Sequence, residues 1–382
     1  MDNLTHTLFA VTLSRTPLSR AGRGTTAALL LASNAPDIDI VATAGGGVNY
    51  LAWHRGMTHG PLGVVGLALV SAGLVWIGRR VYDRRRETVK PAKVTRTAAT
   101  VGPEQDASFG MLVAVALIGV LLHVLMDLPT SYGIRILSPF SWRWFAVDWM
   151  PIVDIYLLMV LVIGLLGRPT PAQRRFKAAL VLALMATNYG IRAGAHHQAL
   201  ELAPRLFGPT LPPPCDPSAQ TVSPIDSWPR WAAPSSPQPG KRCLVEMVAM
   251  PTFLSPLRWQ IIAQMSNAFE IHDIDLLDQR FREPETDSEV LWRLTLRYPN
   301  VWTPAVDRAA TTHLGQVFLG FSRFPAARSV VDQNGVTTVR WTDVRFAGGP
   351  MTPNPPLRPV NMFTATVRIG PDSRVLQETL GR

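Results

Sequence analysis

Histidine and aspartate side chains recur at four places in the first third of the chain. They stand in or beside apolar segments, where an ionisable side chain is costly unless it is paired, ligates an ion or faces a watery cavity. Neutral imidazole and carboxylate oxygen are ligands shared by zinc, manganese and iron(II), and zinc is the ion we favour. We expect one or two divalent ions to be held by these side chains: His6, Asp37, Asp39, His54, His59, His123 and Asp127.

The spacing within two pairs supports a shared ion. His123 and Asp127 are four residues apart, so on a helix they project from one face, one turn apart. Asp37 and Asp39 stand two apart after Pro36, and in an extended or turn conformation they point to the same side. Each pair also has a structural interpretation, a buried His–Asp hydrogen bond for the first and turn chemistry for the second.

The same residues indicate the chemistry that such an ion would serve. A divalent ion with an open coordination position lowers the pKa of water towards ~7 and polarises a carbonyl or phosphoryl group. Asp37 or Asp39 would take the proton as general base, or one of them would orient a ligand histidine. Arg55, between His54 and His59, would pair with one of these aspartates or bind a substrate phosphate. Asp37, Asp39 and Arg55 are therefore the catalytic candidates.

The composition predicts that membrane helices position these residues. Of 382 residues 47% are hydrophobic and only 17% are charged, and the mean hydropathy is +0.14. A hydrocarbon core of ~30 Å needs ~17–25 apolar residues, and four runs are suitable: Leu62–Gly78, Phe109–Leu128, Pro151–Gly167 and Phe176–Gly194. Two shorter segments, Leu4–Leu13 and Thr25–Ala35, reach only ~15–18 Å as helices, which predicts a half-spanning hairpin.

The charge distribution sets the predicted topology. The net charge of +10 is concentrated in short connections at residues 15–23, 79–96 and 168–177. Basic residues between apolar segments mark the cytoplasmic side of a membrane, so the pattern favours membrane topology and counts against a nucleic-acid partner. With these clusters inside, all seven candidate ligands fall on the outer side, although they come from separate segments.

The C-terminal half has a different pattern. Residues 1–195 form the predicted membrane domain, residues 196–240 a Pro/Ser-rich linker and residues 241–382 an extracytoplasmic domain. One helix is predicted at Ala305–Phe321, between strand-like runs at Cys243–Met250, Trp259–Met265, Val290–Tyr298, Val336–Phe346 and Met362–Ile369. The predicted fold is thus a mainly α, polytopic membrane domain followed by an α+β domain.

Two cysteines, Cys215 and Cys243, lie in the C-terminal half. A disulfide between them would suit an oxidising compartment, but two cysteines alone leave this pairing open. Neither has a second cysteine at C-x-x-C spacing, which counts against a thiolate metal site.

Four motifs follow one another in the first part of the chain: Met-Asp-Asn-Leu-Thr-His-Thr, Asn-Ala-Pro-Asp-Ile-Asp, His-Arg-Gly-Met-Thr-His, and His-x-x-x-Asp with Pro-Thr-Ser-Tyr-Gly behind it. In combination they resemble the YdjM-like family of inner-membrane metal-dependent hydrolases, also labelled LexA-binding, inner-membrane-associated hydrolases, over roughly residues 1–170. The resemblance implies a bacterial inner-membrane protein with a metal-binding hydrolase core, and the seven candidate ligands occupy the motif positions. Gly60 departs from the family, which often has serine there. The LexA label is not carried over, because the predicted topology puts the site away from the cytoplasm.

These observations predict a multi-pass membrane-bound hydrolase that acts on a lipid-linked or phosphoester substrate beside the lipid bilayer. A non-catalytic membrane scaffold, with a structural metal and a partner-binding outer domain, is the alternative. A transporter that uses its half-helices as an ion path is a third reading, and the absence of paired inverted repeats counts against it.

Overall fold

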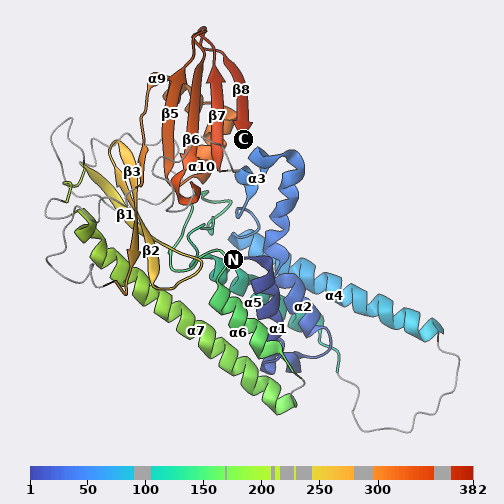
Figure 1. Cartoon of the computed structure of the whole chain (residues 1–382). Coiled ribbons are helices and arrows are strands. Elements are labelled where there is room, and N and C mark those ends of the chain that lie inside the picture. The colour runs from blue at the N-terminus through green and yellow to red at the C-terminus, as the bar shows by residue number, and fades with distance from the viewer. Residues whose placement is uncertain are drawn as a thin grey trace. The chain divides into compact units, whose positions relative to one another are not determined.

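The computed structural model describes residues 1–89, 105–167, 170–207, 211–215, 228, 243–278, 296–347 and 363–381. Contacts divide the chain into a first unit of residues 1–39, 55–142 and 152–190 and a second unit of residues 40–54, 143–151 and 191–382. Helices make up the N-terminal region and two antiparallel four-stranded sheets with helices make up the C-terminal domain (Figure 1). The predicted fold class is therefore confirmed, whereas the domain boundaries at residues 195 and 240 stay a prediction.

Among the described residues, three helices are long and apolar enough to cross a membrane. They are α4 (Pro61–Val89), α5 (Phe109–Asp127) and α7 (Pro171–Leu202). A fourth candidate is a bent pair, in which α2 (Thr25–Ala32) and the 3-10 helix η2 (Ala35–Gly45) meet at 42°. The helix α1 (Asn3–Leu13) and this bent pair cover the two segments for which a half-spanning hairpin was predicted.

The predicted span Pro151–Gly167 holds a shorter helix, α6 (Ile155–Leu165). Its start is set by Asp154, whose side chain accepts a hydrogen bond from the Leu157 backbone N–H at 2.8 Å and so caps the helix. At 1.5 Å per residue, α6 reaches only ~16 Å, about half the thickness of a hydrocarbon core.

A close approach between α2 and α5 prepares the site described below. Gly119 of α5 lies so near the end of α2 that a Cβ on it would stand 3.0 Å from the Ala32 side chain. Because Gly119 and His123 lie one turn apart on the same face of α5, this approach also brings the Ser33 carbonyl within reach of the His123 ring.

The first sheet, sheet 1, contains β1 (Leu244–Pro251), β2 (Arg258–Met265), β3 (Ala268–Asp275) and β4 (Leu296–Pro299), paired in this order. The last turns of α7 and the 3-10 helix η3 (Ala203–Phe207) cover one face of it (Figure 1). Ala199, Leu202 and Leu206 pack there against Trp259 and Ile261. The helix α7 is thus unbroken up to the residues that pack on sheet 1.

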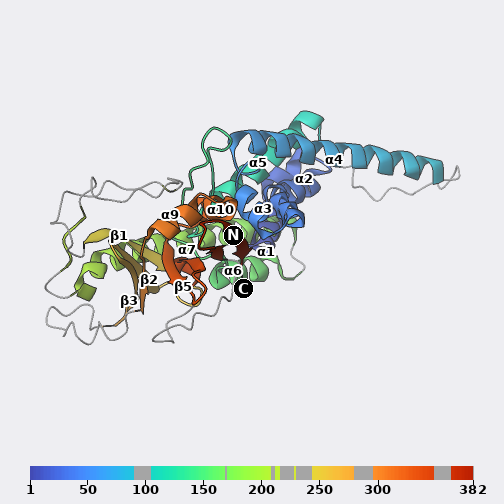
Figure 2. The same ribbon diagram turned by 90° about the horizontal axis from the view of Figure 1, so that it is seen from above.

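The second sheet contains β5 (Pro325–Val331), β6 (Thr337–Asp343), β7 (Thr364–Ile369) and β8 (Val375–Leu380). Two short helices, α9 (Pro304–Ala310) and α10 (His313–Phe321), replace the single helix predicted there and pack against this sheet (Figure 2). The chain divides at Thr311 and Thr312, because the Thr312 hydroxyl accepts a hydrogen bond from the Gly315 backbone N–H and starts a new helix.

A disulfide joins Cys215 to Cys243. It lies where the chain enters sheet 1, since the Cys215 backbone N–H donates to the Leu244 carbonyl and the Leu244 N–H donates to the Pro213 carbonyl, both at 2.8 Å. The pairing that the sequence left open is thus formed. Most of the predicted linker, apart from residues at the end of α7 and around Cys215, lies outside the described residues.

Candidate metal centre

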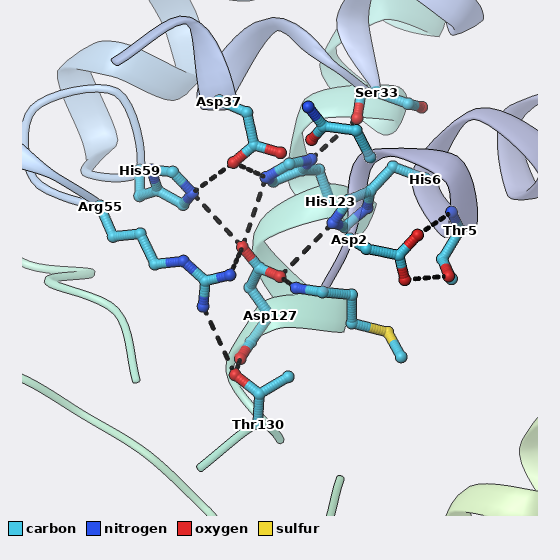
Figure 3. Close-up of polar contacts among 12 residues, drawn as sticks. Asp2, Thr5, His6, Ser33, Asp37, Arg55, His59, His123, Asp127 and Thr130 are labelled. Atoms are coloured by element: carbon cyan, nitrogen blue, oxygen red, sulfur yellow. Dashed lines mark hydrogen bonds and ion pairs between the residues drawn. The ribbon is translucent and has the colours of Figure 1, made fainter. Parts of the chain in front are cut away.

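Four side chains in the first unit gather around one point (Figure 3). Asp37, His59, His123 and Asp127 each direct one ligand atom inwards, and these atoms all lie within 4.8 Å of one another. Asp127 Oδ2 is 3.4 Å from both histidine Nε2 atoms, and Asp37 Oδ1 is 3.6 Å from His123 Nε2 and 3.9 Å from His59 Nε2. Donors at ~2.0–2.1 Å in a tetrahedral zinc site stand about 3.3–3.4 Å apart. The two Asp127–histidine distances match this spacing and the two Asp37 distances are somewhat longer, so a single ion suits the group once Asp37 moves slightly inwards.

The hydrogen bonds of the two histidines favour a cation between the four donors. His123 Nδ1 lies 2.8 Å from the Ser33 carbonyl, which can only accept, so Nδ1 carries the proton and the Nε2 lone pair faces the aspartates. His59 Nδ1 is hydrogen-bonded to the Thr58 hydroxyl at 3.0 Å. Within the part of the chain that the structure describes, His123 Nε2 makes no hydrogen bond. The Nε2 lone pair of His123 and the Asp127 carboxylate oxygen, 3.4 Å apart, repel each other. A cation between them would be attracted by both atoms and would remove this repulsion.

Each of the four residues is placed by its own element. α5 carries His123 and Asp127 one turn apart, as their spacing predicted. η2 carries Asp37 directly after the bend from α2. His59 lies in the turn before α4, where its backbone N–H donates to the Gly56 carbonyl at 2.9 Å.

Burial separates Asp37 from the other three. His59, His123 and Asp127 are no more than 1% exposed, whereas the Asp37 side chain is 14% exposed. Among the four donors, Asp37 is thus the one that solvent or a small reactant can reach.

Comparison with known proteins bears on this site. The sequence model of the YdjM inner membrane protein family matches residues 1–199, slightly more than half of the chain. The chain belongs to the YdjM inner membrane protein family. The matched region contains all four donors and ends within α7, so the resemblance seen in the motifs is confirmed and extends beyond residue 170. No curated protein and no solved structure matches the chain.

The YdjM-family match also covers Arg55, which holds Asp127. Its guanidinium Nη2 lies 3.3 Å from Asp127 Oδ2, and its Nη1 donates to the Thr130 hydroxyl at 3.4 Å and to the Gly133 carbonyl at 3.2 Å. The main-chain nitrogen of Met1 contacts the other oxygen of Asp127. Of the two roles predicted for Arg55, pairing with an aspartate is the one that the structure contains. The partner of its side chain is Asp127, however, and not Asp37 or Asp39 as expected from the sequence.

The backbone around Arg55 is also fixed. Arg55 has a φ of 50°, in the left-handed region that non-glycine residues rarely occupy. Its backbone N–H donates to Asp39 Oδ2 at 2.6 Å, and its carbonyl accepts from the Arg135 N–H at 2.9 Å. Burial lowers the pKa of Arg135 to about 10, which leaves this guanidinium charged at neutral pH.

The remaining candidates lie outside the group of four. The His6 ring stacks on that of His123 with 3.8 Å between centroids, and its Nε2 is 3.4 Å from Asp127 Oδ1. The Asp39 carboxylate accepts from the Arg55 backbone. The His54 ring stacks on Tyr50, whose hydroxyl lies 3.1 Å from His54 Nε2. Ligation by His6, Asp39 or His54 stays a prediction.

Several supporting residues were not found from the sequence. The Ser33 carbonyl has no sequence signal, because any residue supplies one. Thr58 and Thr130 were visible beside their motifs, but their contacts with His59 and Arg55 depend on the fold. Gly60 lies against Ser138, and a Cβ there would collide with the Ser138 carbonyl. Packing in this chain therefore requires glycine at position 60.

Proposed function

We propose that this YdjM-family chain is a membrane-bound metal-dependent hydrolase. The observation that carries the proposal is the group Asp37, His59, His123 and Asp127, in which two imidazole nitrogens and two carboxylate oxygens lie within 4.8 Å of one another. Zinc is the proposed ion, because imidazole and carboxylate without thiolate suit it, and manganese and iron(II) share this preference. Four donors match one ion, and a second ion stays a prediction.

The chemistry follows from which donor is accessible. A divalent ion at such a site acidifies water and polarises a phosphoryl or carbonyl oxygen. Asp37, the donor with exposed surface, would accept the proton at its carboxylate as general base. Asp39 would orient the turn before α4, which carries His59, by accepting the hydrogen bond from the Arg55 backbone N–H. The Arg55 guanidinium would keep Asp127 ionised and in place. Binding of a substrate phosphate by Arg55 is the other proposed role, and its contacts with Asp127 and Thr130 count against it.

The proposed substrate is a lipid-linked or phosphoester compound. His123 and Asp127 lie at one end of an apolar helix of 19 residues that is long enough to cross a bilayer. A reactant at this level has access to both the lipid headgroups and water. Phosphoester hydrolysis suits a site where carboxylates and an ion are held away from bulk water.

We propose that the metal centre and the C-terminal domain face away from the cytoplasm. The basic clusters at residues 15–23, 79–96 and 168–177 support this orientation through the positive-inside rule. The Cys215–Cys243 disulfide supports it independently, because disulfides persist in oxidising compartments. A phosphatase reporter fused after Gly194 is expected to be active, and a cytoplasmic result would reverse the orientation of the whole site.

One observation favours the alternative, a non-catalytic scaffold with a structural ion. Three of the four donors are fully buried, and a closed four-ligand site is typical of structural zinc. The two functions differ at Asp37: a catalytic site needs an exchangeable position there, and a structural site does not.

Hydrolysis assays on the full-length protein in lipid nanodiscs separate these functions. A panel of phosphomonoesters, phosphodiesters and lipid pyrophosphates is tested with zinc or manganese added. Asp37→Asn is expected to abolish turnover while the protein stays folded, and His313→Ala, an exposed histidine on α10, is the matched control with unchanged activity. Metal-loaded wild-type protein without turnover of any substrate class would favour the scaffold.

A further inference from the structure

Three large apolar side chains are exposed at one end of sheet 1. They belong to the β1–β2 turn and to the residues after β3, and we call residues 252–257 and 276–278 the tip of sheet 1. Phe253 is 54% exposed, Leu254 77% and Leu277 67%. Single exposed hydrophobic residues are common on proteins, but three at one end of a sheet form an apolar surface that suits an apolar environment.

Hydrogen bonds within the tip hold its backbone in place. The Thr252 hydroxyl donates to the Ser255 carbonyl at 3.0 Å, which closes the turn. The Trp259 indole N–H donates to the Pro256 carbonyl at 3.0 Å, and the Leu276 N–H joins the two halves of the tip through the Leu257 carbonyl at 2.9 Å. These bonds hold Phe253 and Leu254 outwards at the apex.

Two ring contacts show which way the tip points along α7. His196 of α7 packs edge-on against Trp259, with centroids 5.4 Å apart, at the tip end of β2. Phe207, beyond the end of α7, packs against His272, which pairs with Ile261 farther along the strands. Within the second unit, the tip therefore lies towards the Ile191 end of α7 and away from Phe207.

The position of His196 on α7 sets the level of the tip. The apolar run on α7 extends over residues 176–194, and His196 follows two residues later, about 3 Å along the helix axis. Because α7 is continuous through this region, Trp259 and the tip next to it stand at the level where the apolar run ends.

We propose that the tip of sheet 1 inserts into the interface of the bilayer that α7 spans, with phospholipid as its partner. The β1–β2 half of the tip is uncharged, since the sequence from Met247 to Leu257 contains no charged residue, and Asp278 is the one charged residue within the tip. Arg258, whose side chain is 69% exposed, borders the tip, where its guanidinium can reach lipid phosphate while it pairs with Asp275. An apolar surface of this kind enters ~5–10 Å into the headgroup region. The proposal depends neither on the metal centre nor on the side of the membrane that the domain faces.

Spin labelling of the full-length protein in nanodiscs of phosphatidylethanolamine and phosphatidylglycerol tests this insertion. The two native cysteines are joined in a disulfide, so an introduced cysteine is the free thiol to label. Leu254→Cys carries the nitroxide, and Val330→Cys on β5, 66% exposed, is the matched control. We expect the label at residue 254 to lose access to a water-soluble nickel relaxant and to gain access to oxygen, while the label at residue 330 keeps its access to nickel.

Two results would overturn the proposal. Equal access to nickel at residues 254 and 330 would mean that the tip is in water. Shielding from both nickel and oxygen at residue 254 would mean that protein, from a second copy or another partner, covers the tip. Phe253→Cys and Leu277→Cys repeat the measurement on the same surface, so a folding defect in one variant does not prevent a decision.

Discussion

Replacing Thr58 by valine tests whether the surroundings of the metal centre orient its ligands. The Thr58 hydroxyl is hydrogen-bonded to His59 Nδ1 at 3.0 Å, and valine removes it with little change in volume. A lost neutral hydrogen bond costs ~0.5–1.5 kcal/mol, whereas partners behind a ligand histidine contribute ~10–100-fold in metal affinity. Thr58 is half-buried, so water can replace part of the bond. We therefore expect about a tenfold loss of zinc affinity, which corresponds to ~1.4 kcal/mol.

Competition with a chromophoric chelator, on the full-length protein in nanodiscs, measures this affinity. Thr58→Ser keeps the hydroxyl and is the matched control, for which we expect wild-type affinity. Wild-type affinity in Thr58→Val, or an equal loss in Thr58→Ser, would refute the assignment of His59 as a ligand that is oriented through its Nδ1.

Three further predictions concern the surroundings of the site and the C-terminal domain. Arg55→Leu leaves a buried carboxylate without its guanidinium, so we expect ~3–5 kcal/mol of destabilisation in chelator-treated protein and partial rescue by zinc in thermal melts; an unchanged melting temperature would contradict this. Serine at both Cys215 and Cys243 opens a loop with a sequence separation of 28 and should cost ~3–4 kcal/mol in urea unfolding, which reduction of the wild type should reproduce. Gly119→Val should cost ~1–3 kcal/mol by crowding α2 and should weaken metal binding. Gly110→Val on the same helix, with open space around it, should leave metal binding unchanged, and equal effects at both glycines would argue against the close approach.

Much of the candidate site follows from the sequence because its spacing is local. His123 and Asp127 share a helical face at any position of that helix, and the positive-inside pattern puts both at the same end as Asp37 and His59. The contact of His54 with Tyr50 could not be predicted from the His-Arg-Gly-Met-Thr-His motif. The left-handed backbone of Arg55 could not be predicted either, because its φ accompanies the contact with Asp39 and does not follow from its own residue type.

The fold of the C-terminal domain was less accessible to sequence reasoning. Strands β3, β5 and β8 were not predicted, since each has a composition that departs from an alternating apolar pattern. β3 contains Glu270 and His272, both buried only through tertiary contacts, β5 starts with Pro325, and β8 is largely exposed. The shortening of α6 likewise depends on a cap by Asp154, which the hydropathy of the run does not reveal.

The metal content of the purified protein tests the central claim most directly, namely that four residues hold one ion. Elemental analysis of the detergent-purified full-length chain should give one equivalent of a divalent metal. That metal should be lost in His123→Ala and in Asp127→Asn, and retained in His313→Ala. A wild-type protein that binds no divalent metal after reconstitution, or full occupancy in both ligand variants, would contradict the metal centre.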